Sequence, residues 1–221
     1  MSEALSHLGV SHLPEFLEAL DGIVYLVAAD GTILATNRRL WNAFAHSGGA
    51  PGLTPEFVRG RSLFAMIAGD EVRSIARRMH DAALTTHRQG NISYTFRCDA
   101  PDVERRMRIS ASALSIEGSD LGVLYQSTLL SEAVRAPISL FEPATMDAYF
   151  DHERVKQIVT LCSYCHAVAW PPDATAKDRD WIDPTDYYRR GGLSDVRVSH
   201  GICPSCYETV VARELDRNED R

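Results

Sequence analysis

Two matched pairs of cysteines near the end of this 221-residue chain constrain its fold more than any other feature. The pairs are Cys162 with Cys165 and Cys203 with Cys206, and about 37 residues separate them. Four thiolates form a soft ligand set that suits tetrahedral zinc. Since four sulfurs close the coordination shell and leave no position for water, we expect a structural zinc site with these four cysteines as ligands.

Other uses of these cysteines stay open. His166 directly follows Cys165, so Cys162–His166 also matches the C-x-x-C-H attachment motif of c-type haem, which leaves the second pair unexplained. His166 or His200 is a candidate to replace a cysteine ligand or to donate a hydrogen bond to a sulfur. Thiols that respond to oxidants are a further alternative. The fifth cysteine, Cys98, is expected to be a packed or surface thiol in a strand.

Charge and hydropathy restrict the class of protein. The formal net charge of −7 argues against a general nucleic-acid-binding protein, because affinity for phosphate requires a basic surface. No apolar run reaches the roughly 20 residues that span a bilayer, and the first residues lack the pattern of a signal peptide. We therefore predict a cytoplasmic protein with neither a nucleic-acid nor a membrane partner, where paired cysteines more often bind metal than form disulfides.

The region from about residue 14 to residue 131 has a recurring pattern of short strands and helices. An apolar, β-favouring run at 23–28 is followed by the turn Asp30–Gly31 and a second short strand at 32–36, which together indicate a hairpin. Asn37 then suits the N-cap position of a short helix.

Further elements follow in the same region. Glycine and apolar residues at 60–67 predict another short helix, and apolar residues at i, i+3, i+4 and i+7 predict a long amphipathic helix over 70–87. Three strands are expected at 92–98, 104–116 and 121–129. The middle strand alternates apolar and polar residues, so we expect one face to be buried.

This order of elements resembles a PAS domain. The resemblance rests on the hairpin sequence DGTILATN, on the helix sequence GRSLF and on the final three strands. It implies an α+β fold, a five-stranded antiparallel sheet with helices on one face that enclose a cavity. Such domains sense small molecules, light, redox state or oxygen, or act as dimerisation relays without a ligand. A small ligand in the cavity is therefore one expectation.

His80 introduces an alternative cofactor. It lies on the long helix at a place similar to the haem-ligating histidine of PAS domains of the rhizobial oxygen-sensor type. That resemblance implies a haem-based gas or redox sensor with His80 as the iron ligand. The same position also suits a histidine at the rim of the apolar stripe that bonds to a carboxylate or to the backbone. No cysteine occurs at 60–70, so flavin photoadduct chemistry is not expected.

The end of the chain is expected to form a separate module. Residues 131–137 indicate a boundary, and an apolar face over 145–161 predicts a connector helix. The segment 160–208, with its string SHGICPSC, resembles the cysteine-rich C-terminal segment of bacterial PAS-containing signalling proteins and sensor-kinase relatives. Few aliphatic residues fall in this segment, so we expect a thin core and a large contribution of the metal to folding.

Together these patterns predict three parts: a PAS-like sensor domain over 14–131, a linker and connector helix over 132–161, and a four-cysteine zinc-binding module over 162–213. No phosphate-binding loop, nucleophile–base pair or kinase block is legible, so we do not expect an enzyme. The sequence predicts a cytoplasmic signal-sensing or relay protein that acts through a homodimer or a signalling partner protein. The alternatives are a haem-based sensor that uses His80 and a zinc–thiolate redox switch.

Overall fold

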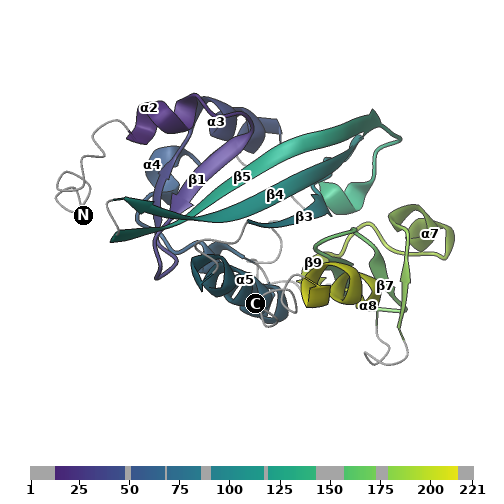
Figure 1. Ribbon diagram of the computed structural model, residues 1–221. Helices are drawn as coiled ribbons and strands as arrows, with labels where there is room; N and C mark the ends of the chain where they lie inside the picture. The colour runs from purple at the N-terminus through teal and green to yellow at the C-terminus, as the bar shows by residue number, and fades with distance from the viewer. Residues whose placement is uncertain are drawn as a thin grey trace.

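The computed structural model describes residues 13–47, 51–67, 69–85, 91–116, 119–142, 157–172 and 179–213. Figure 1 shows an N-terminal part built on one sheet and a smaller C-terminal part, coloured green to yellow, that lies beside helix α5. The two sheets have five and four strands. Within the described ranges, no helix is both long and apolar enough to cross a membrane.

The N-terminal sheet is antiparallel throughout and has the strand order β2-β1-β5-β4-β3. The first and last strands of the domain, β1 and β5, therefore lie side by side in the middle of the sheet. The α+β fold and the five-stranded antiparallel sheet predicted from the sequence are confirmed. The strands are β1 Ile23–Val27, β2 Ile33–Thr36, β3 Ile92–Arg97, β4 Val103–Ile116 and β5 Ser119–Val134.

In the described part of the chain, the helical elements of the N-terminal part are α2 Leu13–Glu18, α3 Arg38–Ser47, α4 Pro55–Val58, the 3-10 turn η1 Phe64–Met66 and α5 Asp70–Thr85. The helix expected at 60–67 is reduced to η1. The long amphipathic helix is confirmed as α5 up to Thr85, and residues 86–90 lie outside the described part of the chain. Its apolar stripe buries Ile75, Met79 and Ala83.

Asn37 precedes α3 as expected, but its side chain does not cap that helix. The fully buried amide accepts a hydrogen bond from the Val24 N–H at 3.0 Å and donates one to the Gly22 carbonyl at 2.8 Å. The first N–H group of α3, that of Arg38, instead bonds to the carboxylate of Glu18. Asn37 therefore fixes the entry to α3 against strand β1.

The C-terminal sheet has the order β8-β7-β6-β9, in which β6 and β9 run parallel and the other pairs are antiparallel. Its elements are β6 Ile158–Cys162, β7 Val168–Trp170, β8 Asp180–Ile182, α7 Pro184–Arg189, β9 Arg197–Gly201, α8 Pro204–Cys206 and the π-helical turn η4 Tyr207–Ala212. The connector helix predicted over 145–161 is wrong at its end, because 158–161 belong to β6. Residues 143–156 lie outside the described ranges.

The C-terminal part has a larger core than its composition predicts. The 3-10 turn η2 Ser139–Phe141, within the segment expected to be a linker, contributes Leu140 and Phe141 to it. The Tyr188 hydroxyl accepts a hydrogen bond from the Leu140 N–H at 3.1 Å and holds η2 in place. The buried residues of this core are Ile138, Leu140, Phe141, Val159, Leu161, Val168, Ile182, Tyr187, Val196 and Val198.

Candidate metal centre and adjoining cavity

The parallel pairing of β6 and β9 brings the two cysteine pairs together. In this register Cys162 lies opposite Gly201, so both strands end at the same edge of the sheet. After β6 the chain makes a tight turn, in which the His166 N–H donates to the Cys162 carbonyl at 2.9 Å and His166 has a positive φ of 61°. After β9, Cys203 is the N-cap residue of α8. Each pair therefore sits in a short turn at the end of its strand.

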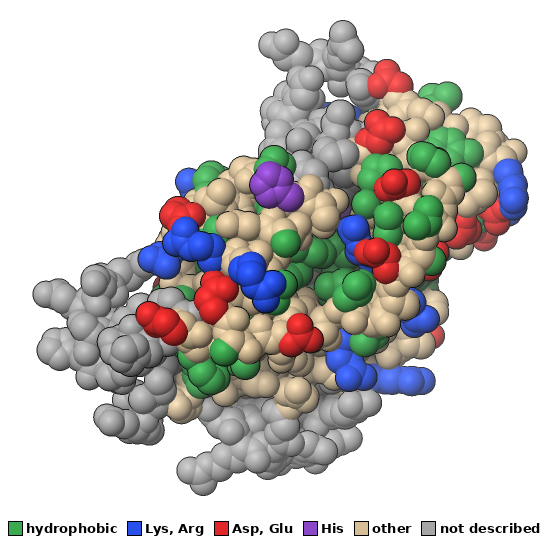
Figure 2. Space-filling model, turned by 90° about the horizontal axis from the view of Figure 1, so that it is seen from above, with side chains coloured by type: hydrophobic (Ala, Val, Ile, Leu, Met, Phe, Trp, Pro, Cys, Tyr) green, Lys and Arg blue, Asp and Glu red, His purple; other side chains and the backbone are tan. Residues whose placement is uncertain are grey.

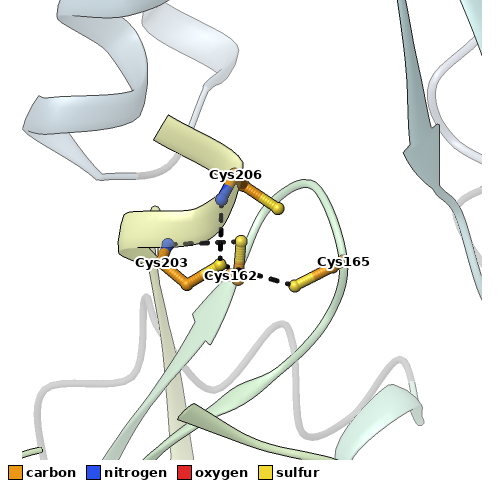
Figure 3. Close-up of side chains that lie close together, drawn as sticks. All are labelled: Cys162, Cys165, Cys203 and Cys206. Carbon is orange, nitrogen blue, oxygen red and sulfur yellow. Dashed lines mark hydrogen bonds between the residues drawn. The ribbon is translucent and has the colours of Figure 1, made fainter. Parts of the chain in front are cut away.

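The four sulfur atoms lie within 4.8 Å of one another, between the turn after β6 and the start of α8 (Figure 3). The sulfurs of Cys165 and Cys203 are 3.7 Å apart. Four sulfurs bound tetrahedrally at about 2.3 Å from a zinc ion stand roughly 3.8 Å from one another. Cys162 and Cys203 are buried, and Cys165 and Cys206 are partly exposed. The donor set and its spacing fit a four-thiolate zinc site.

Backbone groups favour negative charge at this cluster. The Cys203 N–H donates to the Cys162 sulfur, and the Cys206 N–H donates to the Cys203 sulfur, each at 3.4 Å. The thiol of Cys165 is the main cause that lowers the pKa of Cys162. Burial opposes it, and the backbone N–H groups of Cys203, Cys165 and Tyr164 add to the lowering. Burial is the main cause that raises the pKa of Cys206 to about 12. A metal that binds all four sulfurs therefore has to displace protons.

Neither His166 nor His200 belongs to the sulfur cluster, which consists of the four cysteines. The Nδ1 atom of His166 instead lies 3.4 Å from the Asp99 carboxylate. The alternative of c-type haem at Cys162–His166 leaves unexplained why the second pair lies against the first. The remaining cysteine, Cys98, is separate from the cluster, and burial raises the pKa of its thiol to about 11, as expected of a packed thiol.

Asp99 is a buried carboxylate that sequence reasoning missed. It lies 2.5 Å from Arg97 and 2.7 Å from Arg135, and it also accepts a hydrogen bond from the Arg105 N–H at 3.1 Å. Burial raises the pKa of Asp99, but His166, Arg97 and the Arg105 N–H outweigh it and hold the pKa well below its usual range. This ion cluster joins the end of β3, the end of β5 and the first cysteine turn. The sequence signal that could have predicted this cluster is an acidic residue directly after one predicted strand, followed by a strand rich in arginine.

A cavity of about 300 Å³ lies between the sheet and α5. Tyr25, Tyr94 and Tyr125 of the sheet, Met79 of α5 and Tyr164 of the first cysteine turn are among the residues that line it. Burial raises the pKa of all four tyrosines, that of Tyr94 to about 12, so their phenols are neutral. None of the described residues that line the cavity is acidic, basic or a histidine.

His80 is fully buried rather than at the rim of the helix stripe. Its Nε2 lies 3.1 Å from the Ala28 carbonyl oxygen, which can only accept, so Nε2 carries the proton and donates it. Its Nδ1 accepts a hydrogen bond from the Tyr125 hydroxyl, at a distance of 2.9 Å. Burial is the main cause that lowers the pKa of His80, which keeps the ring neutral. Both ring nitrogens are therefore occupied, and His80 is not among the residues that line the cavity. Nothing here supports the haem alternative.

No family model and no curated protein matches the chain. Solved structures similar to it include Vibrio cholerae VqmA, with 13% identity over 53% of this chain and 49% of that chain and a TM-score of 0.38. The PAS domain of an HTR-like protein from Haloarcula marismortui has 16% identity over 58% of this chain and 98% of its own, with a TM-score of 0.36. Phage VqmA in its complex with DPO has 15% identity over 59% and 57%, with a TM-score of 0.42.

The chain thus spans about half the length of Vibrio cholerae VqmA, and these likenesses concern the fold alone. The antiparallel order β2-β1-β5-β4-β3, with helices packed on the sheet and a cavity beneath α5, is the PAS fold that the sequence predicts. A four-cysteine cluster follows it near the C-terminus.

Proposed function

We propose that this chain is a signal-sensing or relay protein, in which a PAS sensor domain is packed against a structural zinc module and acts through a homodimer or a partner protein. One observation carries the proposal: the two parts share a single buried cluster. It contains Ile75 and Met79 of α5, Tyr164 of the first cysteine turn, and Cys203 with Ile202 at the second. Because the cluster is shared, a change of ligand in the PAS domain alters the packing of the zinc module, and a change of metal in the zinc module alters the packing of the PAS domain.

Close contacts between the two parts support this coupling. The Arg97 N–H at the end of β3 donates to the Tyr164 carbonyl at 2.8 Å. The Tyr164 hydroxyl lies 3.9 Å from the sulfur of Met79 on α5. Gly69, directly before α5, has a φ of +84°, and a Cβ there would lie 2.5 Å from the His200 carbonyl oxygen. The start of α5 and strand β9 are thus in direct contact.

The end of β5 and the segment that follows it connect this junction to exposed apolar residues on the surface. The Arg135 guanidinium binds Asp99, and the Ile138 N–H donates to the Pro101 carbonyl at 2.9 Å, so this segment folds back onto the β3–β4 turn. Leu129, Leu130 and Val134 near the end of β5 are exposed. These apolar side chains favour contact with a second copy or a partner protein, and the homodimer stays a prediction.

The function of the zinc ion in this proposal is structural. When bound, it supplies four metal–sulfur bonds that hold the two cysteine turns in one place. Catalysis is not part of the proposal. On the face shown in Figure 2, acidic and basic side chains are interspersed and form no continuous basic patch. The expectation of no nucleic-acid partner stays a prediction.

The test has two readouts on the purified full chain. Elemental analysis and visible absorption should give about one zinc ion per chain and no Soret band. Hydrogen exchange should then show that removal of zinc with a chelator lowers protection in α5 and β3 as well as in the cysteine turns. A chain without bound metal, or exchange changes confined to residues 157–213, would contradict the proposal.

The partial exposure of Cys165 and Cys206 favours a zinc–thiolate redox switch as a second candidate. Two thiolates, one hydrogen peroxide molecule and two protons would give one disulfide and two water molecules, with release of the zinc ion. The Cys165 and Cys203 sulfurs are 3.7 Å apart, which is van der Waals contact, so a disulfide of about 2.05 Å between them requires the sulfurs to approach further. Zinc release measured against peroxide dose tests this function, and retention of zinc under mild oxidant excludes it.

A further inference from the structure

The wall of the PAS cavity includes part of the metal centre. Ser163 and Tyr164, the two residues between Cys162 and Cys165, line the cavity together with residues of the sheet and α5. The ring of Tyr164 lies 5.3 Å from the ring of Tyr94 on β3. Ser163 and Tyr164 lie between two metal ligands in sequence, Cys162 and Cys165, so a bound metal fixes the position of this part of the cavity wall.

Ser163 has a feature that points to a ligand. Its hydroxyl oxygen is buried and, among the described residues, has no hydrogen-bond partner. Buried hydroxyls are nearly always bonded, because an unsatisfied one loses its bonds to water without replacement. The Ser163 backbone N–H, by contrast, is satisfied by the Gly201 carbonyl at 2.9 Å. Since Ser163 lines the cavity, a polar group of a molecule bound there would supply the missing partner.

The rest of the lining defines the chemistry of that molecule. The described lining contains no charged side chain, so a charged ligand would be buried without a counter-charge. Aromatic side chains of the sheet and of the first cysteine turn form much of the lining: Tyr25, Tyr94, Phe96, Tyr125 and Tyr164. The volume of about 300 Å³ is small for a ligand cavity. A small, neutral, flat molecule fits these properties.

We propose that the cavity binds a small neutral aromatic molecule whose polar group hydrogen-bonds to the Ser163 hydroxyl, and that zinc at the adjoining cysteines strengthens this binding by fixing Ser163 and Tyr164. This inference rests on the proposed function and names the ligand class and the coupling. The coupling is reciprocal, so the ligand must also strengthen zinc binding by the same factor.

Three probes of one shape test the ligand class on the zinc-loaded full chain by calorimetry or fluorescence at neutral pH. They are 2-naphthol, naphthalene and 2-naphthoate. We expect 2-naphthol to bind most tightly, naphthalene roughly 5-fold more weakly for want of the hydrogen bond, and 2-naphthoate more than about 10-fold more weakly because its charge is buried. Equal affinity for the three probes, or no binding of any of them, overturns the ligand class.

Substitution of Ser163 tests the specific contact. In Ser163→Ala, the preference for 2-naphthol over naphthalene should fall roughly 5-fold and affinity for naphthalene should be retained. Ser205→Ala is the matched control, because Ser205 lies between the second pair of cysteines but is exposed. The assignment of Ser163 is overturned if both variants keep the preference of the parent chain.

The coupling is tested from both directions. Removal of zinc should weaken 2-naphthol binding roughly 5-fold or more, and saturating 2-naphthol should slow the loss of zinc to a chelator. The measurement of zinc loss starts from the folded, zinc-loaded chain, so it tests the coupling even if the zinc module unfolds once the metal is removed. If 2-naphthol binds but leaves zinc loss unchanged, the coupling is wrong. The proposed function is tested separately, by the metal content and the hydrogen exchange of the chain in the absence of these probes.

Discussion

The Arg97 N–H donates to the Tyr164 carbonyl at 2.8 Å, so the end of β3 bonds directly to the first cysteine turn. Beside this bond, Asp99 binds Arg97 and lies 3.4 Å from His166 of the same turn. The PAS sheet and the metal centre are therefore joined through backbone and side chains at one place. Substitutions at this junction should affect both parts of the chain.

Tyr164→Ala should destabilise the fold by about 3 to 5 kcal/mol, because a buried aromatic ring at the junction is lost and a cavity remains. Tyr164→Phe keeps the ring and should cost less than about 1.5 kcal/mol. Denaturant unfolding of the zinc-loaded chains measures both free energies. Tyr207→Ala is the control, since this tyrosine of η4 is 41% exposed and its loss should change stability little. Similar costs for Tyr164 and Tyr207 would show that the junction is not tightly packed.

Asp99→Asn should destabilise the chain by about 3 kcal/mol at neutral pH, because it leaves Arg97 and Arg135 without their buried counter-charge. The pKa of Asp99 is lowered in the folded state, so its contribution is present above the unfolded value of about 3.9 and lost as the pH falls through the folded value. Unfolding free energies of parent and variant should therefore converge at acid pH.

Asp186→Asn is the control for the Asp99 prediction. Asp186 also binds an arginine, Arg189, at 2.9 Å, but its side chain is 45% exposed. Its removal should cost less than about 0.5 kcal/mol. If both variants lose the same small amount, the buried cluster around Asp99 adds little to stability.

Local signals in the sequence located most of the PAS sheet. The turn Asp30–Gly31 marks the β1–β2 hairpin, the apolar spacing of 70–87 marks α5, and the alternation in 104–116 marks the buried face of β4. In β4, Met107, Ile109 and Ala111 are buried. These elements follow from periods of 3.6 and 2 residues, which depend on neighbouring residues alone.

Contacts between distant residues account for what the sequence did not reveal. The apolar run at 158–161 suits a helix as well as a strand, and its pairing with Arg197–Gly201 decides for the strand. The cysteine spacing predicted the sulfur cluster. It could not reveal that Ser163 and Tyr164 face the PAS cavity, because that contact depends on how the two parts pack.

Cys203→Ser should remove most of the bound zinc, because one buried ligand of the four is lost. The variant should also unfold at lower denaturant concentration, since metal binding contributes to folding. Elemental analysis after gel filtration, with unfolding curves, measures both effects. Cys98→Ser is the control: Cys98 lies outside the sulfur cluster, so this variant should retain about one zinc ion per chain. Zinc retained in both variants would exclude the four-thiolate site.

Gly69→Ala should destabilise the chain by about 1 to 3 kcal/mol. The φ of Gly69 is +84°, and the added methyl group would lie 2.5 Å from the His200 carbonyl oxygen on β9. Zinc should also be lost faster to a chelator, because the clash separates α5 from the metal module. Gly52→Ala is matched, since a Cβ at Gly52 meets no atom within 4 Å. Unchanged stability and zinc loss in Gly69→Ala would rule out the close approach of α5 and β9.

His80→Gln should reduce the loss of stability on mild acidification. Burial lowers the pKa of His80, so below about pH 6.5 the unfolded chain takes up a proton that the folded chain excludes. The stability that His80 contributes is therefore present above about pH 6.5 and is lost as the pH falls toward the lower folded value.

Unfolding free energies at about pH 7.5 and about pH 5.5 measure this effect. Burial also lowers the pKa of His200, so the parent chain has a second source of pH dependence. The change in unfolding free energy between the two pH values is therefore compared between the parent chain and the variant. His46→Gln, on the exposed side of α3, should keep the slope of the parent chain. If His80→Gln keeps that slope as well, burial does not hold the His80 imidazole neutral in the folded chain.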